Sequence, residues 1–187
     1  IGLPITILSL KNEHEIAVIE MGANHVGEIK QLCEIAQPTH GIITNIGSAH
    51  IGEFGGIENI IKAKNELYDY LKKHNGCIIY NQDDNILKEI VNNYSNTHSY
   101  NLPQNITSNQ ANESLHFTYK CDPYISINYD DSISLKTNII GKYNLNNITA
   151  AIIISSLFGI EKKQINKKLS MFRLKNNRSQ FIHANRI

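Results

Sequence analysis

The chain has 187 residues, of which 41% are hydrophobic, and it carries 18 Lys and Arg against 17 Asp and Glu. This length suits one domain with a sizeable core and is too short for two full domains. The formal net charge of +1 gives no electrostatic case for a nucleic-acid or membrane-surface partner. No apolar run approaches the roughly 20 residues that a membrane helix needs. These features indicate a soluble globular protein.

The cysteines indicate the redox environment of the protein, and the chain ends indicate whether it is part of a longer one. Cys33, Cys77 and Cys121 lie far apart and form no CxxC pair. Their odd number excludes a full disulfide framework and their spacing disfavours a metal cluster, so we expect reduced thiols in a cytoplasmic protein. The chain begins with Ile rather than Met and ends on NRI without a stop-like tail. We therefore expect a piece of a longer protein.

The first hundred residues alternate between short apolar runs and amphipathic stretches. The runs at residues 15–20, 40–45 and 77–80 are rich in β-branched residues and predict buried strands. Strands that alternate with helices over short connections favour a parallel arrangement. The pattern therefore predicts an α/β fold with a mostly parallel sheet flanked by helices.

The helices of this half are predicted from apolar spacing. Three helices are expected, over residues 27–37, 57–72 and 86–94. Pro38 ends the first helix, and a turn at 81–84 can cap the third. A glycine-rich loop is expected over 46–56.

The second half of the chain follows a different pattern. Residues 97–140 alternate apolar and polar side chains in short stretches, with a turn predicted at 130–132, so a small antiparallel β segment is expected. A helix is predicted over 144–158, with Gly159 as its cap, and a basic helix over 162–170.

Polar side chains follow the first two predicted strands. Glu20, Asn24 and His25 come after the first strand, and Asn45 and His50 come after the second. Ligands of parallel α/β sheets lie beyond the carboxyl ends of the strands. A carboxylate and an imidazole there could share Mg²⁺ or Mn²⁺, which takes few protein ligands. The alternatives are a helix N-cap neighbour for Glu20 and a solvated loop histidine for His50.

Three further features have both a structural and a functional interpretation. Lys64 lies on the apolar face of helix 57–72, where a lysine either extends its amine to solvent or serves a site. Asn144 and Asn147 lie one turn apart at a helix start, where one can cap and the pair could read a purine edge. Arg178 is either a phosphate clamp or a linker residue. The chain contains neither a GxxxxGK[ST] nor a GxGxxG loop.

Five segments together carry a family resemblance. They are EMGANHVGEI (20–29), TNIGSAHIGEFGG (44–56), KAKNELYDYL (62–71), GKYNLNNITAA (141–151) and NNRSQF (176–181). In this order they resemble the central domain of the Mur ligases over nearly the whole chain. The opening IGLPITIL resembles the segment that follows the family's phosphate loop. The GANHxGEI and AHxxxFGG pieces resemble the branch that adds D-alanyl-D-alanine to UDP-N-acetylmuramoyl-tripeptide in peptidoglycan precursor synthesis.

The resemblance implies ATP and Mg²⁺ as cofactors and ATP-dependent amide formation through an acyl phosphate. It implies that Glu20 and His50 are Mg²⁺ ligands. Lys64 would be the family's carbamylated lysine, which helps hold a second Mg²⁺, so His50 and Lys64 are the expected catalytic residues. Asn45 would help shape the loop that holds the nucleotide and the metal.

The same resemblance implies the remaining site residues. Asn144 and Asn147 would contact the adenine side of ATP, and Arg178 its phosphates. Asn24 and His25 would lie on the side of the UDP-N-acetylmuramoyl-tripeptide substrate.

The resemblance also implies a domain arrangement. Residues 1–175 would form the central ATP-binding domain without its upstream phosphate loop, and 176–187 a linker or the start of a C-terminal ligase domain. Without that loop we expect residues 1–187 alone to be inactive. A monomer is expected, with no membrane insertion. The alternatives are another ATP-dependent Mur-type or folylpolyglutamate synthetase-like ligase, and a non-catalytic remnant domain.

Overall fold

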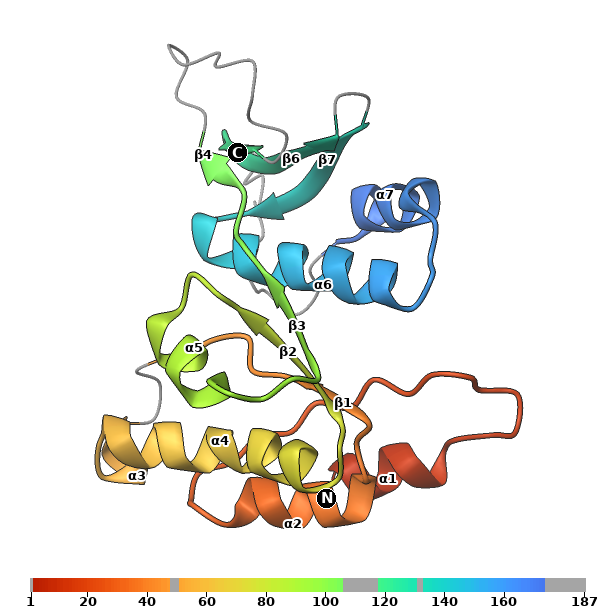
Figure 1. Ribbon diagram of the computed structural model, residues 1–187. Helices are drawn as coiled ribbons and strands as arrows, with labels where there is room; N and C mark the ends of the chain where they lie inside the picture. The colour runs from red at the N-terminus through yellow and green to blue at the C-terminus, as the bar shows by residue number, and fades with distance from the viewer. Residues whose placement is uncertain (1, 48–50, 106–117, 131–132, 174–187) are drawn as a thin grey trace, which may run out of the picture. The chain divides into compact units, whose positions relative to one another are not determined.

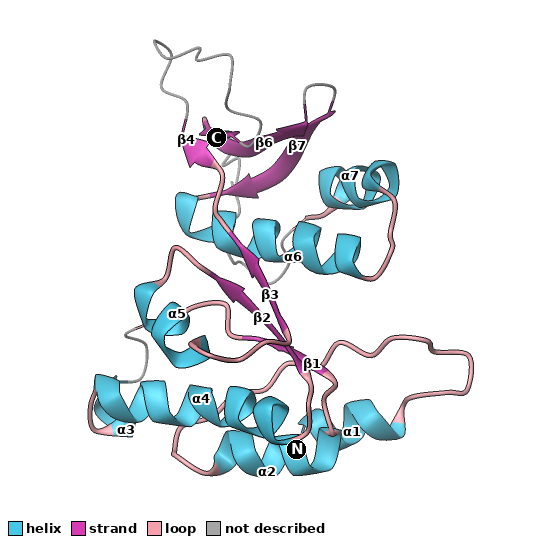
Figure 2. Cartoon of the chain, viewed as in Figure 1, coloured by secondary structure: helices cyan, strands magenta, loops and turns pink. Residues whose placement is uncertain are grey.

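The structure divides into two compact units. The computed structural model describes residues 2–47, 51–105, 118–130 and 133–173. The units are Ile1–Tyr100 and Asn101–Ile187, and both combine helices with strands (Figure 2). Within the described ranges, no helix is long and apolar enough to cross a membrane.

The first unit contains a three-stranded parallel sheet in the order β1-β2-β3. Its strands are β1 (His40–Ile42), β2 (Cys77–Asn81) and β3 (Thr97–Tyr100). Its helices are α1 (Gly2–Leu8), α2 (Glu28–Ala36), α3 (Ile51–Phe54), α4 (Ile57–Lys73) and α5 (Asn85–Val91). Helix α4 packs against β1 and β2, and α2 packs against α4 (Figure 1). The predicted α/β class is confirmed.

Local sequence signals explain where these elements begin, end and meet. Helix α2 ends just before Pro38, as predicted. The Asp84 side chain caps α5 by accepting hydrogen bonds from the backbone N–H groups of Ile86, at 3.0 Å, and Leu87, at 3.1 Å. Helix α4 approaches β1 closely at Gly41, because a Cβ atom there would lie 2.6 Å from Cδ1 of Leu71.

The core of the first unit lies between the sheet and its helices. It consists of Ile43, Tyr68, Leu71, Ile78, Leu87 and Val91. The buried Tyr68 hydroxyl accepts a hydrogen bond from the Ile43 N–H at 3.0 Å and donates one to the Ile79 carbonyl at 2.9 Å. One α4 side chain thereby joins the end of β1 to β2.

The predicted buried strand over residues 15–20 is wrong. This segment has no regular structure, and the side chains of Ile16 and Val18 are 49% and 86% exposed. A β-branched run becomes a strand only where a neighbouring strand completes its hydrogen bonds. Among the described residues, β1 pairs only with β2, so no ladder includes residues 15–20.

Two other boundaries also differ from the prediction. Residues 97–100 form β3, which is parallel to β2 and follows it through α5, so the antiparallel segment does not begin at residue 97. The alternation of side chains predicts a strand but not the direction of its partner. The predicted loop over 46–56 contains the short helix α3.

The second unit contains a four-stranded sheet in the order β4-β5-β6-β7. Its strands are β4 (Gln104–Asn105), β5 (Thr118–Cys121), β6 (Tyr124–Asp130) and β7 (Ile133–Ile140). A short 3₁₀ turn, η1 (Lys142–Asn144), leads into α6 (Leu145–Leu157) and α7 (Lys162–Met171). Strands β5, β6 and β7 are antiparallel, as predicted, whereas β4 is parallel to β5.

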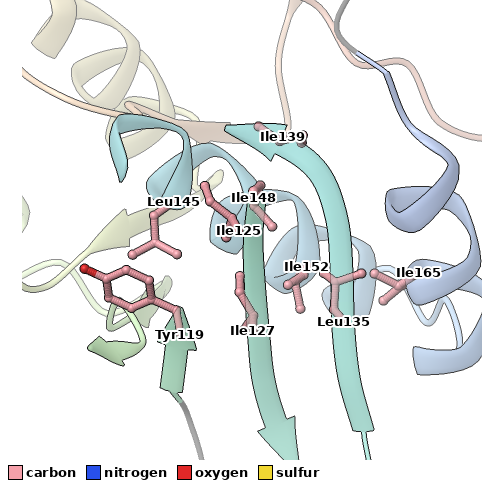
Figure 3. Packing of buried hydrophobic residues seen from close by; sticks show 9 residues of the cluster. All are labelled: Tyr119, Ile125, Ile127, Leu135, Ile139, Leu145, Ile148, Ile152 and Ile165. Atoms are coloured by element: carbon pink, nitrogen blue, oxygen red, sulfur yellow. The ribbon is translucent and has the colours of Figure 1, made fainter. Parts of the chain in front are cut away.

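One face of this second sheet carries the core of the unit. Tyr119, Ile127 and Leu135 are aligned across β5, β6 and β7. Helices α6 and α7 cover this face, and Figure 3 shows the resulting cluster. It consists of Tyr119, Ile125, Ile127, Leu135, Ile139, Leu145, Ile148, Ile152 and Ile165.

The three cysteines are free thiols, as predicted. Cys33 and Cys77 are buried, and Cys121 is exposed. Burial raises the pKa of the Cys33 thiol to about 11, with the nearby Glu66 and Glu34 carboxylates adding to this effect. Cys33 is therefore protonated and unreactive at neutral pH.

Candidate functional site

Lys64 lies against the loop that follows β1. Its Nζ atom donates a hydrogen bond to the backbone carbonyl of Asn45, with the two atoms 2.7 Å apart. Lys64 is half-buried, and desolvation lowers the pKa of its amine. A lowered pKa increases the fraction of neutral, nucleophilic amine, which is the form that reacts with CO₂ to give a carbamate. The structure thus brings Lys64 and Asn45, two of the predicted site residues, together.

Glu20 precedes the glycine-containing turn that leads into α2. Its side chain is exposed. The next residue, Met21, places its sulfur 3.9 Å from the thiol of Cys33 on α2. Met21, the residue after Glu20, therefore contacts α2, although the strand predicted over residues 15–20 is not formed.

Asn24 and His25 form the turn before α2, and Glu28 fixes this turn. The Glu28 carboxylate accepts hydrogen bonds from the backbone N–H groups of Asn24, at 2.7 Å, and His25, at 3.2 Å. Its other oxygen lies 3.2 Å from Nδ1 of His25. The hydrogen bond from Asn24 is the main reason that the pKa of Glu28 is lowered, and the contacts with His25 add to it. The side chains of Asn24 and His25 are nevertheless exposed.

Sequence reasoning missed a second carboxylate at this turn. Glu66 of α4 accepts hydrogen bonds from the backbone N–H groups of Gly27, at 2.5 Å, and Lys30, at 2.9 Å. A local signal did exist for Glu28, because a glutamate early in a helix often bonds the backbone just before it. Glu66 lies 39 residues from Gly27, so no local pattern could identify it.

The two predicted adenine-side asparagines belong to the second unit. Asn144 ends η1, and its amide donates a hydrogen bond to the Ile140 carbonyl at 2.8 Å. Because this amide reaches back toward β7, it makes no side-chain cap on α6. The capping interpretation is therefore wrong for Asn144. Asn147 lies in the first turn of α6 with an exposed side chain, which leaves it accessible to a ligand.

The remaining predicted site residues, His50 and Arg178, lie outside the described residues. Within the part of the chain that the structure describes, no group of three or more His, Cys, Asp or Glu side chains could hold a metal ion. The donor chemistry nevertheless suits Mg²⁺, which keeps several waters and needs only one or two protein carboxylates. The Glu20 carboxylate meets this need as it stands, whereas Lys64 meets it only once carbamylation replaces its positive charge with anionic oxygens.

A shallow pocket of about 490 Å³ lies elsewhere in the first unit. Its lining includes His40, Cys77 and His98, which lie at the amino ends of the three strands. Asn45 and the Lys64 amine that bonds to it lie beyond the opposite, carboxyl end of β1, and neither lines this pocket, so the pocket is not the candidate site.

Comparison with known proteins identifies the family. The model for the Mur ligase middle domain matches residues 1–155. A UDP-N-acetylmuramoyl-tripeptide–D-alanyl-D-alanine ligase of Bacillus subtilis is 34% identical over 97% of this chain and 38% of its own length. The ligase of the same name from Haemophilus influenzae is 33% identical over 85% of this chain and 34% of its own length.

Solved structures agree with the sequence comparison. A crystal structure of MurF from Acinetobacter baumannii matches 98% of this chain with a TM-score of 0.77 and 29% identity. The match covers 40% of that MurF chain, and the chain thus spans about two fifths of the proteins it resembles. On the strength of the match over residues 1–155, the chain belongs to the Mur ligase middle-domain family.

Proposed function

We propose that the chain is the middle domain of an ATP-dependent ligase that joins D-alanyl-D-alanine to UDP-N-acetylmuramoyl-tripeptide during peptidoglycan precursor synthesis. The observation that carries this proposal is the 34% identity, over 97% of the chain, to a relative with that name. Because the chain spans only about two fifths of such relatives, the activity belongs to the full-length protein.

The proposed reaction forms an amide in two steps. The γ-phosphate of ATP is transferred to the terminal carboxylate of the tripeptide, which gives ADP and an acyl phosphate. The amine of D-alanyl-D-alanine then attacks the acyl carbon, and inorganic phosphate leaves with one of the original carboxylate oxygens. The triphosphate and the carboxylate repel each other, so the enzyme must neutralise charge and hold both groups in line.

The first unit would supply the metal and substrate groups. Glu20, His50 and carbamylated Lys64 would hold Mg²⁺, which when bound offsets the negative charge of the phosphates. The half-buried Lys64 amine, with its lowered pKa, supports this role. Asn45 would shape the loop beside it, since its carbonyl already accepts a hydrogen bond from Lys64.

Other polar residues would bind the two large substrates. The exposed Asn24 and His25 would face the tripeptide substrate. Asn144 and Asn147 would contact the adenine side of ATP, and Arg178 its phosphates. The proposed protein is a cytoplasmic monomer, with residues 1–175 as its central domain and 176–187 leading into a ligase domain.

A phosphate-release assay tests the proposal. The full-length protein is incubated with Mg²⁺, ATP and UDP-N-acetylmuramoyl-tripeptide, with D-alanyl-D-alanine, with single amino acids, or with no amine. We expect phosphate release that depends on the dipeptide. Release with a single amino acid instead would indicate another Mur-type or folylpolyglutamate synthetase-like ligase, and no release with any amine would indicate a non-catalytic remnant.

A further inference from the structure

The amino end of α2 lacks a cap of its own. Its N-cap residue is Gly27, which has no side chain and adopts a φ of 98°, a left-handed conformation that favours glycine. The first N–H groups of a helix have no partner within that helix and need an acceptor from elsewhere. In most helices the side chain of the N-cap residue supplies that acceptor.

Glu66 supplies the missing acceptor from a different helix. One carboxylate oxygen accepts from the Gly27 N–H at 2.5 Å, and the other accepts from the Lys30 N–H at 2.9 Å. Lys30 is the third residue of α2, so Glu66 occupies the position that an N-cap side chain normally fills. Its negative charge also interacts favourably with the positive end of the α2 dipole.

The carboxylates of Glu28 and Glu66 form two successive links between the Asn24–His25 turn and α4. Glu28, in the first turn of α2, holds the backbone of Asn24 and His25. Glu66 in turn holds that first turn of α2 to α4. The exposed Asn24–His25 turn is therefore tied to α4 through a continuous set of hydrogen bonds.

Helix α4 also carries Lys64, two residues before Glu66. The Lys64 amine reaches the Asn45 carbonyl in the loop after β1. One rigid helix of 17 residues thus fixes both the Asn24–His25 turn and the Lys64 amine. A substitution at Glu66 should shift the Asn24–His25 turn relative to the Lys64 amine, although Glu66 is part of neither group.

We propose that Glu66 is a positioning residue that sets the Asn24–His25 turn relative to Lys64, and so governs binding of the acyl substrate rather than of ATP. This proposal rests on the proposed function, in which the turn faces the tripeptide and Lys64 serves the metal. Both oxygens of the Glu66 carboxylate accept hydrogen bonds from backbone N–H groups at the start of α2, so we assign it a positioning role and no step of the chemistry.

The Glu66→Gln variant in the full-length protein tests this role. Glutamine has the same shape, but it loses the charge and turns one acceptor toward the α2 N–H groups into a donor. We expect the KM for UDP-N-acetylmuramoyl-tripeptide to rise about tenfold, because small misplacements of positioning groups weaken productive binding. The KM for ATP should stay within about twofold of wild type.

The control is Glu58→Gln, which removes an exposed carboxylate from the first turn of the same helix and should change neither constant. If Glu66→Gln does not fold, Glu66→Asp replaces it, because aspartate keeps the charge, is one methylene shorter and should raise the same KM by a smaller factor. Equal changes in both KM values, or a fall in kcat alone, would overturn the positioning role. A wild-type protein without dipeptide-dependent activity would instead refute the proposed function.

Discussion

Tyr68 shows how one residue can hold two strands in place. Its hydroxyl is fully buried and lies between the Ile43 N–H and the Ile79 carbonyl. Burial raises the pKa of this hydroxyl well above its usual range, so it stays protonated and keeps its proton for the Ile79 carbonyl. The Tyr68 hydroxyl of α4 therefore links the residue after β1 to β2.

Replacing Tyr68 by Phe should destabilise the protein by about 1–3 kcal/mol. The change leaves the buried Ile43 N–H without its acceptor, and an unpaired buried polar group costs free energy of that order. Urea unfolding followed by circular dichroism measures the effect. Tyr70→Phe is the matched control on the same helix, where the ring stacks on His74, and it should change the free energy of unfolding by less than about 0.5 kcal/mol. Equal effects of the two variants would contradict this role for Tyr68.

Lys64 should give the protein a pH-dependent contribution to stability. Desolvation lowers the pKa of Lys64 below its ordinary value of 10.5, so between the two pKa values the unfolded chain binds more protons than the folded one. Stability from this residue therefore rises with pH across that window and is reduced below it. We expect the free energy of unfolding of wild type, relative to Lys64→Met, to increase from pH 8 to pH 10.5. A relative decrease over this range would contradict the predicted shift.

The candidate site could be predicted from the sequence only where its signals were local. The motif residues Lys64 and Asn45 meet in the structure, and the side chains of the Asn24–His25 turn are exposed. The contribution of Glu66 could not be predicted, because it depends on how α2 packs against α4 and not on any spacing along the chain. Residue types predict the chemistry that is possible, whereas packing decides which residues position it.

At the scale of elements, the amphipathic helices were predictable and the first strand was not. The backbone hydrogen bonds of a helix interior lie within that helix, and Pro38 and Asp84 in the adjacent sequence mark the end of α2 and the start of α5. The run at residues 15–20 has the composition of a strand but needs a partner strand. Partner strands are a property of the whole sheet, which explains why this prediction failed and why β3 was assigned the wrong direction.

The Asp84 cap gives a test at this scale. Asp84→Ala removes the acceptor for the Ile86 and Leu87 N–H groups and should lower the free energy of unfolding by about 1 kcal/mol. Asp84→Asn keeps a capping oxygen and should cost only a few tenths of this amount. Thermal unfolding of both variants makes the comparison, and an asparagine variant as unstable as the alanine variant would count against side-chain capping.

At the scale of the whole molecule, the formal net charge of +1 is the sum of an acidic first unit and a basic second unit. Residues 1–100 carry 7 Lys and Arg against 12 Asp and Glu, whereas residues 101–187 carry 11 against 5. The acidic balance of the first unit fits the residues proposed there to hold cations, and the basic balance of the second fits those proposed to meet ATP. The overall charge alone could not indicate this division.

The proposed function has one central claim, that the full-length protein makes an amide through an acyl phosphate. The most direct measurement uses UDP-N-acetylmuramoyl-tripeptide labelled with ¹⁸O in its terminal carboxylate, together with ATP, Mg²⁺ and D-alanyl-D-alanine. Mass spectrometry of the released inorganic phosphate should detect one ¹⁸O atom, because the carboxylate oxygen that receives the γ-phosphate leaves with it. Phosphate without label, released while the amide product accumulates, would contradict the claim.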